Sequence, residues 1–142
     1  MNFKILIIFL FVFLTNLSAC RLWALCTKAE HVISSLPHNE KTQIIKQLEA
    51  MFYQSVSNPN GWAFLNYDST LNFNNISVYR SHLPAYSDSA IYWNKALTMI
   101  DSGHNRIGIG HIRLASSGVN DIPNPHPWVF KRDSINYSLI HN

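Results

Sequence analysis

Cys20 has a position in the chain that would let one residue supply both a nucleophile and its base. An apolar run over residues 5–14 and the small pair Ser18-Ala19 precede it. If the chain is cut after Ala19, Cys20 becomes the first residue and carries a thiol together with a free α-amine. A deprotonated thiol is a nucleophile, an amine can take its proton, and both groups titrate within reach of neutral pH. A single proteolytic cut would therefore create an active site.

The first nineteen residues have the pattern of a secretory signal peptide. Lys4 supplies a basic start, bulky apolar residues follow, and polar Thr15 and Asn16 end the run. The run is too short to span a bilayer. A buried N-terminal helix or strand is the structural alternative. A signal peptide over residues 1–19 predicts a secreted or periplasmic protein.

The same cut could instead create a lipid anchor. Leu17-Ser18-Ala19-Cys20 resembles the cleavage box of bacterial lipoproteins. Lipidation converts the thiol into a thioether and usually acylates the amine, so both catalytic groups are lost. A free Cys20 and a lipidated Cys20 are therefore exclusive predictions. The second gives a non-enzymatic, membrane-anchored lipoprotein.

The composition restricts the remaining possibilities. Removing 19 of the 142 residues leaves 123, enough for one domain over residues 20–142. Loss of Lys4 lowers the net charge from +3 to +2, which gives no electrostatic reason to expect nucleic acid as a partner. Cys20 and Cys26 are the only cysteines, so a disulfide framework is not expected, although a single bridge between them stays open. The seven histidines have no compact metal-ligand spacing, so no metal or cofactor is expected.

Hydrophobic periodicity predicts an α+β domain whose helices are segregated from a largely antiparallel sheet. An amphipathic helix is expected over residues 39–57, with Ile44, Ile45, Leu48, Met51 and Phe52 on its apolar face. A second helix follows Ser87 or Asp88, with its apolar residues at Ala90, Trp93, Leu97 and Ile100. Strands are expected over residues 22–25, 62–67, 76–79, 106–114 and 134–140, with a loop over 115–128. Gly108 and Gly110 share one strand face, which predicts close packing there.

Five segments of the chain together resemble one enzyme family. They are Cys20-Arg21-Leu22, Gly61-Trp62-Ala63-Phe64, the run His111-Ile112-Arg113-Leu114-Ala115-Ser116-Ser117-Gly118, Asn124-Pro125-His126-Pro127-Trp128, and the terminal His141-Asn142. Their types and order resemble the class II glutamine amidotransferases, which are N-terminal-nucleophile enzymes. The similarity is greatest to the stand-alone branch whose mature chain starts Cys-Arg-Leu. Because the joint pattern places its nucleophile at Cys20, it favours a free cysteine over a lipidated one.

This resemblance implies a four-layer αββα sandwich and a role for each matched residue. Cys20 would attack the side-chain amide of glutamine or a γ-glutamyl-type small molecule and form a thioester. Arg113 would bind the substrate α-carboxylate with its guanidinium fork, supported by Ser116. Asn142 would donate to the oxyanion of the tetrahedral intermediate. His126 would frame the site without acting as a base.

The chain departs from the family pattern at its end. The family continues beyond the position of Asn142 with a glycine that completes the oxyanion hole and with further sheet and helix. We therefore expect an incomplete sandwich and weak or absent turnover, because loss of one oxyanion donor costs about 10²–10³-fold in rate. Another N-terminal-nucleophile amidohydrolase, acting on a different amide, is the enzymatic alternative. The expected reaction is hydrolysis, since no acceptor domain is present.

Overall fold

The structure is a computed structural model that describes residues 19–28, 30–68, 75–115 and 124–141. The expected signal peptide, apart from Ala19, lies outside these residues. The elements in chain order are β1 (Arg21–Cys26), the 3₁₀ helix η1 (Ile33–Ser35), α2 (His38–Gln54), β2 (Trp62–Asp68), β3 (Asn75–Ser81), α3 (Ser89–Asp101), β4 (Asn105–Ile112), β5 (Trp128–Arg132) and β6 (Ile135–Leu139). The α+β class expected from the sequence is confirmed.

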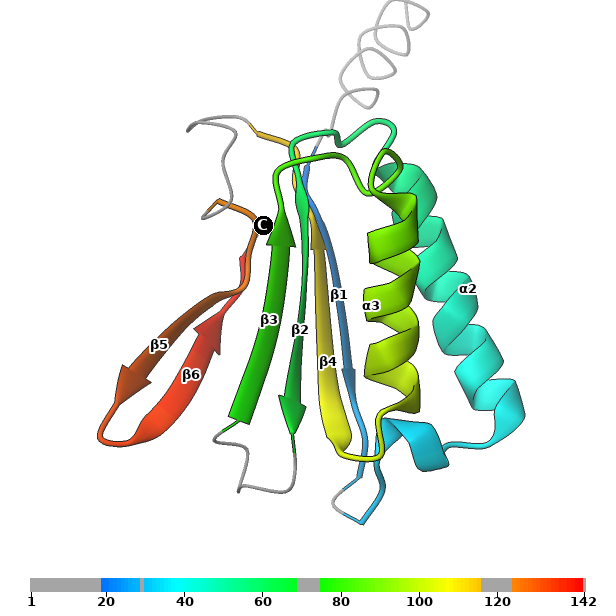
Figure 1. Cartoon of the computed structure of the whole chain (residues 1–142), viewed down its shortest axis with the longest axis vertical. Coiled ribbons are helices and arrows are strands. Elements are labelled where there is room, and N and C mark those ends of the chain that lie inside the picture. The colour runs from blue at the N-terminus through cyan, green and yellow to red at the C-terminus, as the bar shows by residue number, and fades with distance from the viewer. Residues whose placement is uncertain (1–18, 29, 69–74, 116–123, 142) are drawn as a thin grey trace, which may run out of the picture.

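Four strands form one antiparallel sheet in the order β1-β4-β2-β3. The central strand β4 pairs on one side with β1 and on the other with β2, so that Ile112 lies opposite both Arg21 and Trp62. The helices α2 and α3 cover one side of this sheet, and the hairpin β5–β6 lies on the other (Figure 1). One end of the sheet therefore gathers the start of β1, the end of β4 and the start of β2.

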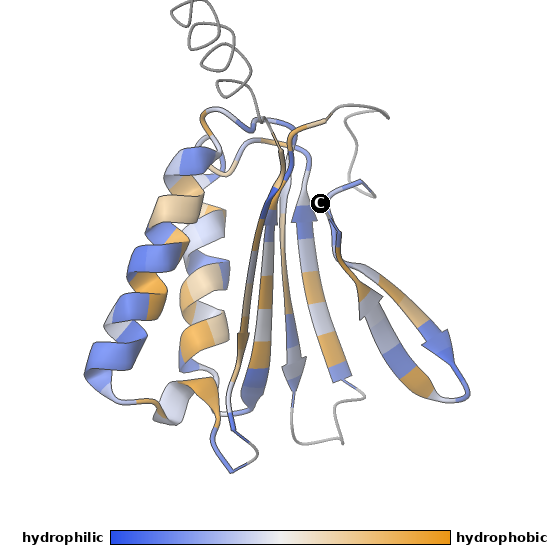
Figure 2. Ribbon diagram, turned by 180° about the vertical axis from the view of Figure 1, so that it is seen from behind, coloured by the Kyte–Doolittle hydropathy of each residue, from blue (hydrophilic) through white to orange (hydrophobic). Residues whose placement is uncertain are grey.

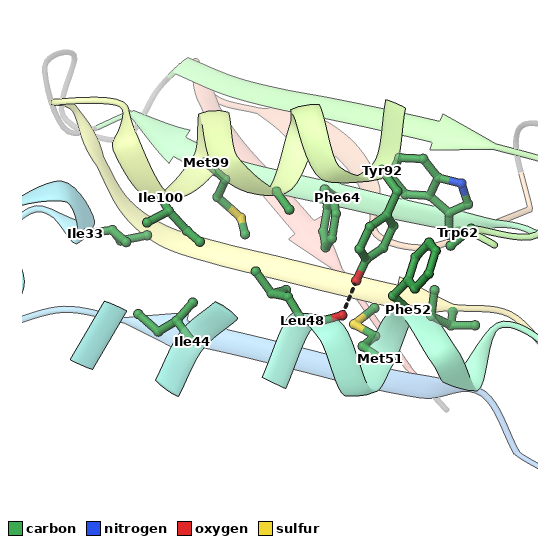
Figure 3. Close-up of a cluster of buried hydrophobic side chains, with 13 residues drawn as sticks. Ile33, Ile44, Leu48, Met51, Phe52, Trp62, Phe64, Tyr92, Met99 and Ile100 are labelled. Atoms are coloured by element: carbon green, nitrogen blue, oxygen red, sulfur yellow. Dashed lines mark hydrogen bonds between the residues drawn. The ribbon is translucent and has the colours of Figure 1, made fainter. Parts of the chain in front are cut away.

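The hydrophobic core lies between the two helices and the sheet (Figure 3). Tyr92 of α3 is fully buried, and its ring centroid lies 4.9–5.2 Å from those of Phe64, Trp62 and Phe52. The Tyr92 hydroxyl donates to the Leu48 carbonyl oxygen of α2 at 2.7 Å, which joins the two helices and satisfies the buried hydroxyl. Four of the five residues expected on the apolar face of α2 are buried, namely Ile44, Leu48, Met51 and Phe52, whereas Ile45 is 37% exposed.

The glycine pair of β4 allows the helices to approach the sheet closely, as its shared face predicted. A Cβ on Gly108 would lie 2.7 Å from the sulfur of Met99, and one on Gly110 would lie 3.0 Å from Met51 Cε and 2.9 Å from Phe64 Cε1. The side chains of α2 and α3 thus occupy the space that larger residues in β4 would need.

The apolar face of α3 lies one residue earlier than the sequence interpretation placed it. Tyr92, Ala96, Met99 and Ile100 are buried, whereas Leu97 is 44% exposed. Only Ile100 belongs to both sets. Burying Tyr92 satisfies its hydroxyl, and the small side chain of Ala96 lets the helix come close to the sheet.

The strand β5 was not expected from the sequence. It pairs with β6 through a two-residue turn in which Asp133 and Ser134 have φ values of 50° and 66°. Such turns favour Asn-Gly or Asp-Gly, so Asp-Ser gives a weak signal, and the expected start of the last strand at Ser134 falls inside the turn. Hydrophobic and hydrophilic residues alternate along β6, whereas β5 has its hydrophobic residues first and its two basic residues at the end (Figure 2). The polar Asn136 and Ser138 are half-buried, while Ile135, Tyr137 and Leu139 are exposed.

The hairpin is attached to the main sheet by polar contacts. The Tyr67 hydroxyl of β2 donates to Ser138 Oγ of β6 at 2.7 Å. Arg80 of β3 donates from Nε to the Pro125 carbonyl oxygen at 3.1 Å and from Nη2 to that of Pro127. One guanidinium thus holds the segment that leads into β5. Among the described residues, no helix has the length and hydrophobicity needed to cross a bilayer.

Candidate active site

The five segments that resemble one enzyme family (the matched segments) converge at the end of the sheet where β1 begins and β4 ends. One residue beyond the Arg21–Ile112 pair, Cys20 lies across from Arg113. The Arg113 N–H donates to the Gly61 carbonyl oxygen at 2.8 Å, and the Asn60 N–H donates to the Arg113 carbonyl oxygen at 3.1 Å. The antiparallel ladders thus bring residues 20, 61 and 113 together.

The Cys20 thiol is held by the backbone of Leu114. The Leu114 N–H donates to Sγ at 3.4 Å, and the S–H faces the Leu114 carbonyl oxygen at 3.5 Å. The side chain is half-buried and the thiol is free. An N–H that points at sulfur is placed to hydrogen-bond a sulfur anion in a nucleophilic step.

Cys26 cannot pair with Cys20 in this fold. The two cysteines lie at opposite ends of the extended strand β1 and are separated by about 20 Å at the usual rise per residue. A disulfide requires Cα atoms within about 7 Å. The bridge that the sequence left open is therefore excluded by the geometry of β1.

The peptide before Cys20 is fixed by two side chains. The Ala19 carbonyl oxygen accepts a hydrogen bond from Asn58 Nδ2 at 2.7 Å and another from Arg21 Nη1 at 2.6 Å. Asn58 is only 3% exposed and follows α2 directly, where its N–H donates to the Gln54 carbonyl oxygen at 3.0 Å. The peptide group between Ala19 and Cys20 therefore has a defined position.

Asn60 ties the same turn to the residues after Arg113. Its Oδ1 accepts the Ala115 N–H at 3.0 Å. Together with the contact between Asn60 and Arg113, this bond fastens the turn over residues 58–61 along the end of β4. The turn thereby forms one wall of the site beside Cys20.

The segment over residues 124–128 packs against this wall. A Cβ on Gly61 would lie 2.8 Å from Pro125 Cγ, which shows how close the two segments are. The next residue, His126, stacks on His111 with ring centroids 4.5 Å apart and rings 10° from parallel. The His126 N–H donates to His111 Nδ1 at 2.9 Å.

His141 completes a cluster of three imidazoles with His111 and His126. Its ring centroid lies 4.3 Å from that of His126, and its carbonyl oxygen is 2.9 Å from His126 Nδ1. This histidine cluster joins the end of β4, the segment that leads into β5 and the second residue after β6. All five matched segments thus have described residues at this end of the sheet.

Burial and nearby positive charge favour the neutral forms of His111 and His126. Burial, together with smaller effects of His126, Arg113 and His141, lowers the pKa of His111 to about 3. The pKa of His126 is also lowered, mainly by burial, while its hydrogen bond to His141 acts in the opposite direction. Neutral imidazoles with these contacts fit a structural role. Among the described residues, no group of three or more His, Cys, Asp or Glu side chains is arranged to hold a metal ion.

Arg113 is buried at the centre of this arrangement. It is 6% exposed, and alternation along the strand directs it to the same side of the sheet as His111, away from the helices. Its charge acts on both His111 and His126. The structure thus brings Arg113 and Cys20 together, whereas Ser116 and Asn142 lie outside the described residues.

Sequence reasoning missed two groups that contact the peptide before Cys20. The sequence indicates Asn58 only as part of a turn that ends a helix, and Arg21 only as part of a matched motif. In the sequence, the two asparagines on either side of Pro59, directly before Gly61, could have indicated such contacts. Side-chain amides in a turn beside a nucleophile can donate to its neighbouring backbone.

A cavity in the described part of the chain lies away from Cys20. It has a volume of about 510 Å³ and lies at the far end of β1, where Cys26, His31 and Glu40 contribute to its lining. None of the residues around Cys20 lines it.

The chain matches no protein-family model, no curated protein and no solved structure.

Proposed function

We propose that the protein hydrolyses the side-chain amide of glutamine, or of a γ-glutamyl-type compound, through an N-terminal Cys20. The observation that carries this proposal is the convergence of the five matched segments. They are far apart in the sequence, yet Cys20, Gly61, Arg113, His126 and His141 gather at one end of the sheet. The order of the segments resembles class II glutamine amidotransferases, and their proximity is what a shared active site requires.

The chemistry proceeds through a thioester. The Cys20 α-amine takes the thiol proton, and Sγ attacks the amide carbon. The carbon–nitrogen bond then breaks, and ammonia leaves with the proton held by the amine. Water, activated by the same amine, cleaves the thioester and restores the thiol. Glutamate and ammonia are the products.

Arg113 has a proposed role in this reaction, and so do Ser116 and Asn142, which lie outside the described residues. The Arg113 guanidinium pairs with the substrate α-carboxylate, and Ser116 supports that group. Asn142 donates to the oxyanion. No cofactor takes part, because the nucleophile and the base both belong to Cys20.

The finer fold proposal is the four-layer αββα sandwich. Two helices on one side of a sheet form its first two layers, and the hairpin β5–β6 is the beginning of a second sheet on the other side. Supporting this, the side of the sheet away from the helices is apolar, with Leu65 opposite Ile109 across β2 and β4. Apolar residues on both sides of a sheet are typical of a sheet covered on both faces.

Export followed by cleavage after Ala19 is part of the same proposal. A free thiol agrees with the contacts of Cys20, since its sulfur is turned toward Leu114 and not toward solvent. The intact mass of the exported protein distinguishes the two fates. A bare N-terminal cysteine supports the enzyme, and a mass increase of lipid size on Cys20 would replace it with the lipoprotein.

The experiment uses the chain beginning at Cys20 and measures ammonia release from glutamine. A glutamine analogue with a diazomethyl ketone in place of its amide adds a single-turnover readout, because the thiolate displaces nitrogen and leaves a stable adduct. We expect an adduct on Cys20 that is lost in Cys20→Ala and retained in Cys26→Ala. We also expect Arg113→Ala to weaken saturation by glutamine far more than Arg113→Lys.

Absence of both adduct and turnover would refute the proposed function. Faster hydrolysis of penicillin-like or bile-salt-like amides than of glutamine would instead indicate the other N-terminal-nucleophile amidohydrolase. An unchanged KM for glutamine in Arg113→Ala would remove Arg113 from the substrate site.

A further inference from the structure

The hydrogen bonds to the Ala19 carbonyl oxygen indicate which groups surround the Cys20 nitrogen after maturation. The oxygen accepts from Asn58 Nδ2 and from Arg21 Nη1. It lies about 2.2 Å from the Cys20 nitrogen across one peptide group. When Ala19 leaves, Asn58 loses this acceptor at the place where the new α-amine forms, and Arg21 keeps only its longer bond from Nη1 to the Cys20 carbonyl oxygen at 3.4 Å.

Asn58 must then find a new partner. Its side chain is almost fully buried, and a buried amide without a hydrogen-bond partner is unfavourable. The Ser57 hydroxyl lies 3.3 Å from Asn58 Oδ1. Because a hydroxyl can donate or accept, Ser57 tolerates either orientation of the carboxamide. Asn58 can therefore turn its oxygen toward the amine.

Arg21 brings a positive charge to the same nitrogen. A like charge nearby disfavours the protonated form of an amine, and an unprotonated amine is what a general base requires. The other charges near this end of the sheet are Arg113, at the end of β4, and Arg80 of β3, which both act on His126 in the histidine cluster. Among the described acidic residues, Asp88 acts on Tyr79 on the helix side, and Glu30 and Asp133 pair with His31 and Arg132 away from the site.

We propose that Asn58 and Arg21 are positioning residues for the α-amine of mature Cys20. Asn58 Oδ1 accepts one amine N–H and thereby directs the nitrogen lone pair toward Sγ. The Arg21 guanidinium keeps the amine unprotonated before the reaction. The thiol proton then moves to the amine nitrogen, which leaves a thiolate and an ammonium, and the ammonium returns the proton to the departing ammonia. This inference rests on the proposed function, because it concerns the base of that reaction.

The test follows two readouts across pH in the chain that begins at Cys20, with Cys26→Ser as the common background. One readout is the rate at which iodoacetamide alkylates Cys20, and the other is glutamine hydrolysis. In Arg21→Met we expect the pH at which both rates rise to increase by about one unit. In Arg21→Lys we expect that pH to equal the value of the parent protein. Arg21→Gln, which also lacks the charge, substitutes for Arg21→Met if that variant does not fold.

Asn58 variants separate orientation from charge. In Asn58→Ala we expect kcat to fall about tenfold or more, with KM and the pH position unchanged. In Asn58→Asp the added negative charge favours the protonated amine. The rise of both rates should therefore move to higher pH, as it should when the positive charge of Arg21 is removed. Gln54→Ala, an exposed change one turn earlier in α2, is the matched control and should behave as the parent.

Each outcome bears on one of the two proposals. Parental pH positions in Arg21→Met and in Asn58→Asp would overturn the positioning role, even if glutamine is hydrolysed rapidly. Shifted alkylation profiles in a protein that neither hydrolyses glutamine nor forms the diazomethyl ketone adduct would support the positioning role and refute the proposed function. A change of KM alone in Asn58→Ala would assign Asn58 to substrate binding and also overturn the inference.

Discussion

Replacing Gly61 by alanine tests whether the turn beside Cys20 needs glycine. Gly61 has a φ of 109°, a conformation that costs a residue with a Cβ about 1–3 kcal/mol. The new Cβ would also lie 2.5 Å from the Ser81 carbonyl oxygen and 2.8 Å from Pro125 Cγ. Backbone cannot give way like a flexible side chain, so overpacking adds about 1–3 kcal/mol. We expect Gly61→Ala to destabilise the protein by about 2–6 kcal/mol.

Two other glycines provide matched controls for this substitution. A Cβ on Gly103 would have no neighbouring atom within 4 Å, so Gly103→Ala should leave stability within about 1 kcal/mol of the parent. A Cβ on Gly108 would meet Met99 Sδ at 2.7 Å, but a thioether can move, so its cost should lie between the other two. Urea unfolding followed by tryptophan fluorescence measures all three. A loss below about 1 kcal/mol in Gly61→Ala, or an order other than Gly61, Gly108, Gly103, would refute the reasoning.

Three further changes test other parts of the structure. The folded protein resists protonation of His111, so the unfolded chain takes up that proton first as the pH falls. The free energy of unfolding should therefore fall by about 1.4 kcal/mol per pH unit from about pH 6.5 toward pH 3. In unfolding measured across pH, His111→Asn should reduce this dependence. Tyr92→Phe removes the bond to Leu48 and should cost about 1 kcal/mol in urea unfolding, whereas a change below about 0.3 kcal/mol would show that bond to be unimportant. Arg80→Met removes both bonds to residues 125–127, so hydrogen exchange in the hairpin should accelerate while exchange in α2 stays unchanged.

Most of the main sheet and both helices followed from periodicity, because their burial follows the alternation of side chains. The helix α2 is the clearest case, since four of its expected apolar residues are buried together. In α3 nearly every turn offers two apolar residues, so the pattern alone did not decide that Tyr92 is fully buried while Trp93 is only partly buried against the core. The partner of a buried hydroxyl, Leu48, lies on another element and cannot be inferred from α3 itself. The strand β5 is exposed along its whole length, has only three apolar residues in a row and is followed by a weak turn signal.

The site could be predicted as a set of residues but not as an arrangement. The order of the motifs indicated Cys20 and Arg113, and their proximity depends on the register between β1 and β4, which local sequence does not specify. Asn58 was missed because its role comes from a contact with Ala19, 39 positions earlier. The functions of Ser116 and Asn142 stay predictions, since both residues lie outside the described part.

The attachment of Cys20 to Leu114 has a consequence for the order of events during synthesis. The two residues are 94 positions apart, and β1 is an edge strand whose only partner in the described sheet is β4. Contacts this distant form late, because the intervening chain must first be ordered. A newly made chain therefore carries Cys20 without its hydrogen bonds to the Leu114 backbone. Reactivity at Cys20 would then report completed folding, which a pulse of alkylating reagent during refolding could follow in time.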